Sequence, residues 1–275
     1  MPVPSFLKKF DTVNLRLRVI SAAILIPVTL ICVWLGGIAF GAFVTCVVTL
    51  GLYEWLRLVG QKFSARNMGI ACAMLAALMT GGWLISPPFG AMLGVVATLA
   101  LFLLASGEDR AGWIALGIPY LGGSGLALIA LRDIPDIGAA LVLFLLVTVW
   151  GTDIGAFVAG KIWGRAKLAP SISPSKTWAG LAGGMILAAL CGYIAAVVLG
   201  ARRPDIALML SPVLAVIAQV GDLFESHFKR RAGVKESGDL IPGHGGVLDR
   251  VDGLIFAGVF LILFQISVAQ QIDWW

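Results

Sequence analysis

Nine apolar stretches, each long enough to cross a lipid bilayer, constrain this chain more than any other feature. A crossing helix needs about 20 predominantly apolar residues. The predicted spans cover residues 19–37, 38–56, 68–86, 89–106, 112–131, 137–158, 178–200, 206–226 and 251–270. Only 13% of the 275 residues are charged, against about 25% in a soluble domain. The sequence therefore predicts an all-α, polytopic integral membrane protein with about nine transmembrane helices.

The placement of lysine and arginine predicts the side on which each loop lies. If the N-terminus is cytoplasmic and the spans alternate, all but three of the 20 basic residues fall on the cytoplasmic side. The exceptions are Arg132, Arg202 and Arg203. Such a bias orients membrane proteins. It places the two long loops, 159–177 and 227–250, in the cytoplasm, and we expect the inner membrane of a bacterial-type cell.

The net charge of +5 reflects this topology and contact with anionic membrane lipids, not nucleic-acid binding. The first apolar stretch is too long for a cleavable signal peptide and lacks a clear A-x-A site, so we expect a retained span. The four cysteines lie within spans without CxxC spacing, which predicts neither a zinc site nor disulfides.

Polar residues divide the chain into two halves. We predict that residues 1–135 are structural, lipid-facing helices with possible dimer contacts, and that residues 136–275 form the catalytic region. Glu54 is the main acid of the first half. An interfacial acid paired with Arg57 is the favoured interpretation, and a residue lining a site is the other. Trp274 and Trp275 are typical of membrane-interface anchors.

Four carboxylates are expected to meet at the cytoplasmic mouth of the last two spans. Asp222 and Glu225 are three residues apart, as are Asp249 and Asp252, a spacing that puts each pair on one helix face. Ionisable groups in a bilayer cost about 2.5–3.5 kcal/mol each on insertion scales, so they indicate function. Hard oxygen ligands suit Mg²⁺, and a proton relay is the alternative.

Three glycines surround His244 in the segment 242–246. Glycines let the backbone turn sharply, and N–H groups that lead into a helix form an anion site. A flexible turn is the commonest role of such residues. Because charged residues follow directly at 249–252, we favour a phosphate contact by His244, Gly245 and Gly246.

A second polar cluster lies around the sixth and seventh spans. Asp153 is deep in an apolar span, where a buried acid needs a partner, and a hydrogen bond to Thr152 is the modest alternative. Thr177 is a typical helix N-cap. Lys176, beside the same helix start, opposes the helix dipole, which favours an anion as its partner. Lysine binds phosphate as a point charge.

These segments together resemble the phosphatidate cytidylyltransferase family, also called CDP-diacylglycerol synthases. The family pattern runs Ser, any residue, apolar, Lys-Arg, four residues, Lys-Asp, and then Pro, any residue, His-Gly-Gly, two residues, Asp-Arg, any residue, Asp. The matching residues are Ser226, Lys229, Arg230, Lys235, Pro242, His244, Gly245, Gly246, Asp249, Arg250 and Asp252. The Gly-Asp-Leu-x-Glu-Ser block at 221–226 and the Ser-Pro-x-Lys-Thr-x-x-Gly run at 173–180 also match. Glu236 departs from the pattern, which has Asp there.

The resemblance implies that CTP and phosphatidic acid give CDP-diacylglycerol and pyrophosphate. It implies Mg²⁺ as the cofactor, with Asp222 and Asp249 as ligands, and leaves a second cation open. Asp252 would support Arg250, and Ser226 would orient a phosphate. The implied catalytic residues are Asp222, Asp249, Lys229, Ser226, Arg250 and Asp252.

The resemblance also implies phosphate-binding residues and auxiliary acids. The phosphate is already ionised at neutral pH, so His244 is expected to donate a hydrogen bond and not to act as a base. The implied phosphate-binding residues are Lys176, Ser173, Arg230, Lys235, His244, Gly245 and Gly246. The auxiliary candidates are Asp153, Glu225 and Glu236. A homodimer is favoured by the same resemblance.

Two other functions stay open at this point. A CTP-dependent enzyme acting on another membrane lipid phosphate would share the polar residues, because lipid choice depends on the apolar ones. An ion-coupled transporter would use Asp153, Asp222 and Glu225 as a cation path. Transporters are typically built from inverted repeats, and this sequence shows no such repeat.

Overall fold

The computed structural model describes residues 12–60, 63–269 and 272–275 of the chain. Within these ranges nine helical segments are long and apolar enough to cross a membrane, which confirms the predicted all-α polytopic architecture. Residues 1–11, part of the predicted cytoplasmic N-terminus, lie outside the described residues. The elements are α1 (Thr12–Leu35), α2 (Gly37–Val59), α3 (Ala65–Leu84), α4 (Pro87–Leu104), α5 (Ala111–Gly117), η2 (Ile118–Gly122), α6 (Gly123–Arg132), α7 (Gly138–Trp163), β1 (Lys167–Ala169), β2 (Ser173–Thr177), α8 (Trp178–Val198), α9 (Pro204–Arg231), α10 (Leu248–Phe264) and η3 (Gln265–Ala269).

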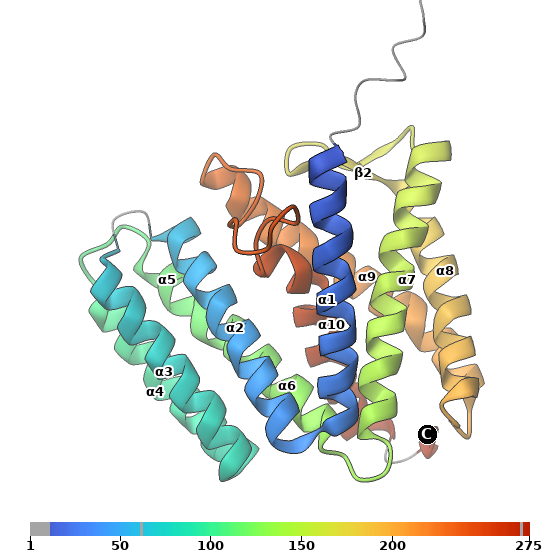
Figure 1. The fold of residues 1–275 in the computed structure, drawn as a ribbon, viewed down its shortest axis with the longest axis horizontal. Coiled ribbons are helices and arrows are strands. Elements are labelled where there is room, and N and C mark those ends of the chain that lie inside the picture. Colours follow the sequence, from blue (N-terminus) through green and yellow to red (C-terminus); the bar gives the residue numbers. More distant parts are fainter. Residues whose placement is uncertain (1–11, 61–62, 270–271) are drawn as a thin grey trace, which may run out of the picture.

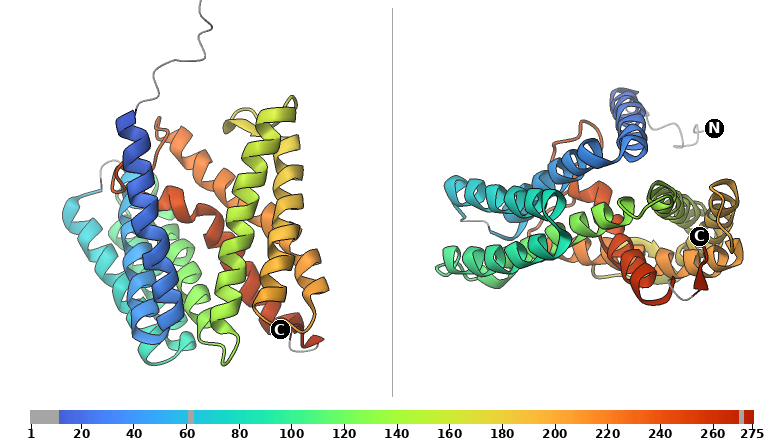
Figure 2. Two further views of the ribbon diagram at one scale, coloured as in Figure 1. Left: turned by 45° about the vertical axis from the view of Figure 1, so that its right-hand side comes forward. Right: turned by 90° about the horizontal axis from the view of Figure 1, so that it is seen from below.

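The helices form two packed groups with α10 between them (Figure 1). On one side α2 packs against α3, and α3 against α4. On the other side α7, α8 and α9 pack in succession, and α10 contacts α9, α7 and α6. Helix α1 packs against α2 and α7 and stands at the outer edge of the bundle when viewed from below (Figure 2). The antiparallel hairpin of β1 and β2 lies at the same end of the bundle as the start of α1.

Close packing of α7 on α8 depends on glycine where the two helices cross. A Cβ atom on Gly155 would collide with the carbonyl oxygen of Gly183, and a Cβ atom on Gly183 would collide with Ala159. Small residues let membrane helices approach each other in this way. The crossing fixes α7, which carries Asp153, against α8, which follows the hairpin directly.

The fifth crossing is interrupted where the sequence has Pro119. Proline lacks an N–H donor, and Ile118–Gly122 forms a π-helical turn between α5 and α6. The ring of Tyr120, in this turn, packs against Trp55, Phe224 and Phe256. An aromatic cluster therefore joins the first half of the chain to α9 and α10, the helices that carry the acids.

The predicted eighth span, which ends at residue 226, is too short. Helix α9 continues to Arg231, and its last turn carries Lys229, Arg230 and Arg231. Cations in the last turn are favoured by the helix dipole, so a basic segment interpreted as a loop forms the helix end. Likewise α7 continues to Trp163, and the hairpin occupies most of the predicted loop 159–177.

The prediction that Trp274 and Trp275 are interface anchors is wrong. Their exposed fractions are 1% and 7%, and both rings pack against Phe144. The Trp274 indole N–H donates to Gln265 Oε1 at 2.9 Å, and the Arg203 amide donates to the Trp274 carbonyl at 2.9 Å. A pocket that offers aromatic contacts and a hydrogen-bond acceptor outcompetes the interface for a tryptophan side chain.

Candidate active site

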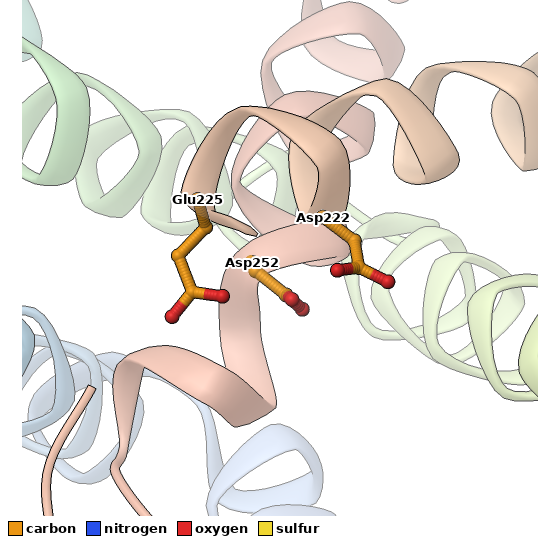
Figure 3. A group of neighbouring side chains, drawn as sticks. All are labelled: Asp222, Glu225 and Asp252. Atoms are coloured by element: carbon orange, nitrogen blue, oxygen red, sulfur yellow. The ribbon is translucent and has the colours of Figure 1, made fainter. Parts of the chain in front are cut away.

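Three carboxylates converge where α9 and α10 cross (Figure 3). Asp222 and Glu225 lie on one face of α9, and Asp252 faces them from α10. One carboxylate oxygen of each residue lies within 4.8 Å of the others. The helices approach closely because residue 221 is glycine: a Cβ atom there would lie 2.5 Å from the Asp252 carbonyl oxygen. The spacing of acids along α9 and the small residue between them thus build the cluster.

Asp249, predicted to share a metal with Asp222, has other partners. Its Oδ1 atom accepts a hydrogen bond from Lys229 Nζ at 2.6 Å. Its Oδ2 atom accepts from the amide and hydroxyl of Ser237 and from the Gly246 amide, each at 2.9 Å. The structure does not bring Asp249 into the three-carboxylate cluster. Its role as a metal ligand stays a prediction.

The Lys229 ammonium lies between two acids. It pairs with Glu225 as well as with Asp249, and only 8% of the residue is exposed. Glu225 is fully buried, its Oε2 atom pairs with Lys229, and among the described residues its Oε1 atom has no hydrogen-bond donor. A buried carboxylate without hydrogen-bond donors is costly. The Oε1 atom of Glu225, which has no partner among the described residues, therefore suits contact with a bound cation.

Lys176 reaches the acid cluster from the hairpin. Its ammonium forms an ion pair with Asp222 Oδ2, and Ser226 Oγ donates to Asp222 Oδ1 at 3.2 Å. Thr177 caps α8 as predicted, accepting from the Gly180 amide at 3.0 Å. The hairpin thus places a lysine, predicted to bind phosphate, directly on the central carboxylate of the site.

A cavity of about 160 Å³ lies between α7, α9 and α10. Its wall includes four carboxylates and one guanidinium group. These charged residues are Asp153, Asp222, Asp249, Asp252 and Arg250. Asp153, predicted from its depth in an apolar span, therefore lies at the same cavity as the acids of α9 and α10. A cavity with mixed charge on its walls suits a ligand that carries phosphate together with a cation.

The glycine loop contacts the first helix, which the sequence did not predict. Arg18 Nε donates to the Gly243 carbonyl at 2.9 Å, and Ser21 Oγ lies 2.7 Å from His244 Nδ1. Partial burial, together with the Arg250 and Arg18 cations, lowers the pKa of His244 below its ordinary value. This lowered pKa favours the neutral form of the His244 imidazole. No spacing in the sequence links α1 to this loop.

Arg250 contacts the loop and not Asp252. Its Nε and Nη2 atoms donate to the His244 carbonyl at 3.2 and 2.6 Å. Asp252 Oδ1 accepts from the Gly253 amide at 2.8 Å and belongs to the acid cluster. Within the described part of the chain, the predicted support of Arg250 by Asp252 is not observed.

The remaining predicted residues lie around the edge of the site. Arg230 ties the end of α9 to the hairpin by donating to the Ile172 carbonyl at 3.1 Å. Ser173 is buried in the hairpin, with its hydroxyl 3.4 Å from that of Ser175. Lys235 and Glu236 are exposed in the segment that follows α9. Their predicted phosphate-binding and auxiliary roles stay predictions.

Glu54 corrects one interpretation of the sequence. It is 1% exposed and accepts hydrogen bonds from the amides of Val247 and Leu248, at 3.0 and 2.8 Å, and from Ser237 Oγ at 3.2 Å. The predicted pairing with Arg57 is wrong, because Arg57 lies over the ring of Tyr53. The only signal available in the sequence was a single acid near the end of an otherwise apolar span.

Fold and site together define a multi-pass membrane enzyme whose carboxylates and lysines meet at a cavity between helices, an arrangement suited to phosphate chemistry. A model described as the cytidylyltransferase family matches residues 16–268. The chain belongs to this family, and it is a nucleotidyltransferase.

Relatives cover nearly the whole chain. A protein from Brucella suis biovar 1 named phosphatidate cytidylyltransferase is 40% identical over 260 residues, covering 94% of this chain and 95% of the relative. Proteins with the same name from Pseudomonas aeruginosa and Bacillus subtilis are 36% and 32% identical. They cover 88% and 90% of this chain, and 94% and 97% of their own lengths. The predicted resemblance to the phosphatidate cytidylyltransferase family is confirmed.

Proposed function

We propose that this chain transfers the CMP group of CTP to phosphatidic acid, giving CDP-diacylglycerol and pyrophosphate. The observation that carries the proposal is the meeting of three carboxylates with the ammonium groups of Lys176 and Lys229. Carboxylates bind hard cations, and lysines neutralise phosphate oxygens. The names of the relatives support the same reaction.

Mg²⁺ is the cofactor that these acids fit, and Asp222, Glu225 and Asp252 would hold it. The fit rests on the three carboxylates that lie within 4.8 Å of one another and on the buried Glu225 Oε1 atom, which has no hydrogen-bond donor among the described residues. When bound, such an ion stabilises charge on the attacking and leaving oxygens of a nucleotidyl transfer. Asp249 lines the same cavity and is the further proposed ligand. A second cation remains a prediction.

The side chains around the acids would position and neutralise the phosphates. Lys176 is paired with Asp222, and it would exchange this carboxylate for a phosphate oxygen. Arg250 is exposed at the cavity wall and supplies a further positive charge. Lys229 is held between Glu225 and Asp249, which fixes the position of its ammonium group. Phosphoryl-type transfers depend mainly on such positioning and charge stabilisation.

The attacking atom would be a phosphate oxygen of the lipid. It forms a bond to the α-phosphorus of CTP while the bond to the leaving pyrophosphate breaks. Since this oxygen is ionised at neutral pH, the transfer needs no strong base. His244, whose pKa is lowered by partial burial and nearby cations, is proposed as a phosphate contact whose ring is oriented by Ser21.

We orient the hairpin, the glycine loop and the N-terminus toward the cytoplasm, in the inner membrane of a bacterial-type cell. The basic residues of the hairpin and of the end of α9 support this orientation through the positive-inside bias. CTP would then enter from the cytoplasm, and phosphatidic acid would enter sideways from the surrounding membrane lipids. The homodimer stays a prediction from the family resemblance.

The test uses the purified full-length protein in lipid nanodiscs with labelled CTP, Mg²⁺ and phosphatidic acid. We expect pyrophosphate and labelled CDP-diacylglycerol in equal amounts, and neither product when the lipid or Mg²⁺ is left out. A polyprenyl phosphate in place of phosphatidic acid separates this reaction from one on another lipid phosphate. The absence of any phosphatidate-dependent pyrophosphate release would overturn the proposal.

A further inference from the structure

We infer that Glu54, on α2, is a positioning residue of the active site. It would hold the start of α10 and the glycine loop so that Asp249 and Lys229 keep their places. The inference rests on the proposed function for its kinetic readout, but its structural readout is independent of any reaction. It assigns a role in the site to the half of the chain that carries few acids.

Glu54 acts as the N-terminal cap of a helix that lies far away in the sequence. The first N–H groups of a helix have no partner within the helix. Val247 occupies the N-cap position of α10, and its side chain forms no capping hydrogen bond. Glu54 Oε1 accepts from the Val247 amide, 193 residues away, and Oε2 accepts from the Leu248 amide. A carboxylate at this end is also favoured by the helix dipole.

Two glycines make room for the Glu54 carboxylate. A Cβ atom on Gly246 would lie 2.6 and 2.7 Å from the two Glu54 oxygens and would collide with Ser237 Oγ. A Cβ atom on Gly238 would lie 2.5 Å from Glu54 Oε1. Real Cβ atoms do not approach other atoms this closely. The backbone at Gly238 and at Gly246 therefore packs directly against the Glu54 carboxylate. At position 246, glycine is needed because a side chain would occupy the space of this carboxylate.

Ser237 connects this contact to the reactive groups. Its hydroxyl lies 3.2 Å from Glu54 Oε2 and 2.9 Å from Asp249 Oδ2. The Ser237 and Gly246 amides donate to the same Asp249 oxygen. The other oxygen of Asp249 holds Lys229. If Glu54 moved, Ser237 and Gly246 would therefore move with it, and the Asp249–Lys229 pair would lose its position.

A carboxylate is the group that these contacts require. In Glu54→Gln, one of the two acceptors becomes an NH₂ group that faces a backbone N–H, so a donor meets a donor. The substitution also removes the negative charge at the start of α10. Glu54→Asp keeps both acceptors and the charge on a side chain one methylene shorter. Misplacing a reactive group by about 1 Å costs roughly 10²-fold in rate.

The experiment compares Glu54→Gln, Glu54→Asp and Thr49→Val in the full-length protein. Thr49 lies on the same helix, and its buried hydroxyl has no partner among the described residues, so its loss controls for disturbance of α2. We expect Glu54→Gln to lower kcat by roughly 10²-fold with a smaller change in KM for CTP. Glu54→Asp should recover part of kcat, and Thr49→Val should keep it.

Hydrogen–deuterium exchange supplies the readout that needs no substrate. Glu54→Gln should speed exchange in residues 237–250, and Thr49→Val should not. Combining Glu54→Gln with Ser237→Ala should lower kcat about as much as the worse single variant, because both act through one path. Wild-type kcat and wild-type exchange in Glu54→Gln would overturn the inference. If the wild-type protein shows no transfer, the proposed function fails, and the exchange experiment still decides the role of Glu54.

Discussion

Lys229 Nζ lies 2.6 Å from Asp249 Oδ1, so the lysine of α9 and the first acid of α10 form a hydrogen-bonded ion pair that links the two helices. The same ammonium pairs with Glu225, one turn earlier on α9. One cation thus balances two buried acids beside the cavity.

Replacing Lys229 by Ala should lower both kcat/KM and thermal stability. Removing one partner of a buried charge pair leaves the other uncompensated and costs about 3–5 kcal/mol. The measurements are steady-state kinetics and thermal unfolding in detergent. In Lys229→Met with Glu225→Gln and Asp249→Asn, the ammonium and both of its carboxylate partners are neutral, so part of the lost Tm should return while kcat/KM stays low. An unchanged kcat/KM in Lys229→Ala would remove the lysine from the phosphate site.

Asp222→Asn should abolish Mg²⁺-dependent turnover while the protein stays folded. Asp222 is partly exposed at the cavity and is bonded by few groups of the chain itself. Mg²⁺ should raise the Tm of the wild-type protein by binding the folded state and should not do so in the variant. Asp205→Asn, which breaks an exposed ion pair at the other end of α9, is the matched control. Turnover at the wild-type level would contradict the metal assignment.

Asp249→Asn should also abolish turnover, but with a fall in Tm. The loss of its charge weakens the bonds from Lys229, Ser237 and Gly246 together. Thermal unfolding curves of Asp222→Asn and Asp249→Asn, recorded together, distinguish a residue needed only for turnover from one that also stabilises the fold. A Tm equal to that of the wild type would show that these bonds do not hold the start of α10.

Glu236→Gln should have a milder effect on turnover than Asp222→Asn. Glu236 is exposed and lies outside the three-carboxylate cluster. A neutral side chain of the same size leaves that cluster unchanged. The ratio of the two kcat values is the measurement, and equal losses would place Glu236 in the reacting centre.

Acid should destabilise the protein through His244. Its pKa is lowered in the folded state by partial burial and by the Arg250 and Arg18 cations, so the unfolded chain binds the proton more tightly. This stability is present above the unfolded value of about 6.5 and is lost as the pH falls toward the folded pKa. The Tm of the wild type should therefore drop more between pH 7.5 and 5.5 than that of His244→Asn. Parallel drops would contradict the assignment.

Trp274→Ala should lower the Tm strongly. The side chain is buried against Phe144 and bonded to Gln265, and Trp→Ala in a core typically costs about 3–5 kcal/mol. Trp163→Ala is the control, because that ring is 67% exposed. Equal Tm values in the two variants would show that the C-terminal ring contributes little.

The sequence predicts those features that depend on neighbours along one helix. Nine spans follow from apolar length, and the shared face of Asp222 and Glu225 follows from their spacing. The approach of Asp252 also follows, because α9 and α10 are consecutive crossings that pack together. In each case the determining interactions are local or join adjacent elements.

The sequence does not predict contacts between elements far apart in the chain. Glu54 on α2 bonds the start of α10, Ser21 on α1 contacts His244 in the glycine loop, and no pattern in either helix marks its partner. The hydrogen bonds that Asp249 accepts from Lys229, Ser237 and Gly246 are likewise not marked by its spacing from Asp252. Helix periodicity predicts the face of the helix on which a side chain lies. It does not predict which other segment of the chain contacts that face.

The bond from Glu54 to the start of α10 has a consequence for exchanging parts between relatives. The carboxylate on α2 fits only where Gly238 and Gly246 leave space for it. A chimaera that joins residues 1–135 of one relative to the remainder of another must bring an acid together with a matching pair of glycines. The two halves of such a protein are therefore matched to each other, and a functional chimaera has to take both from the same relative.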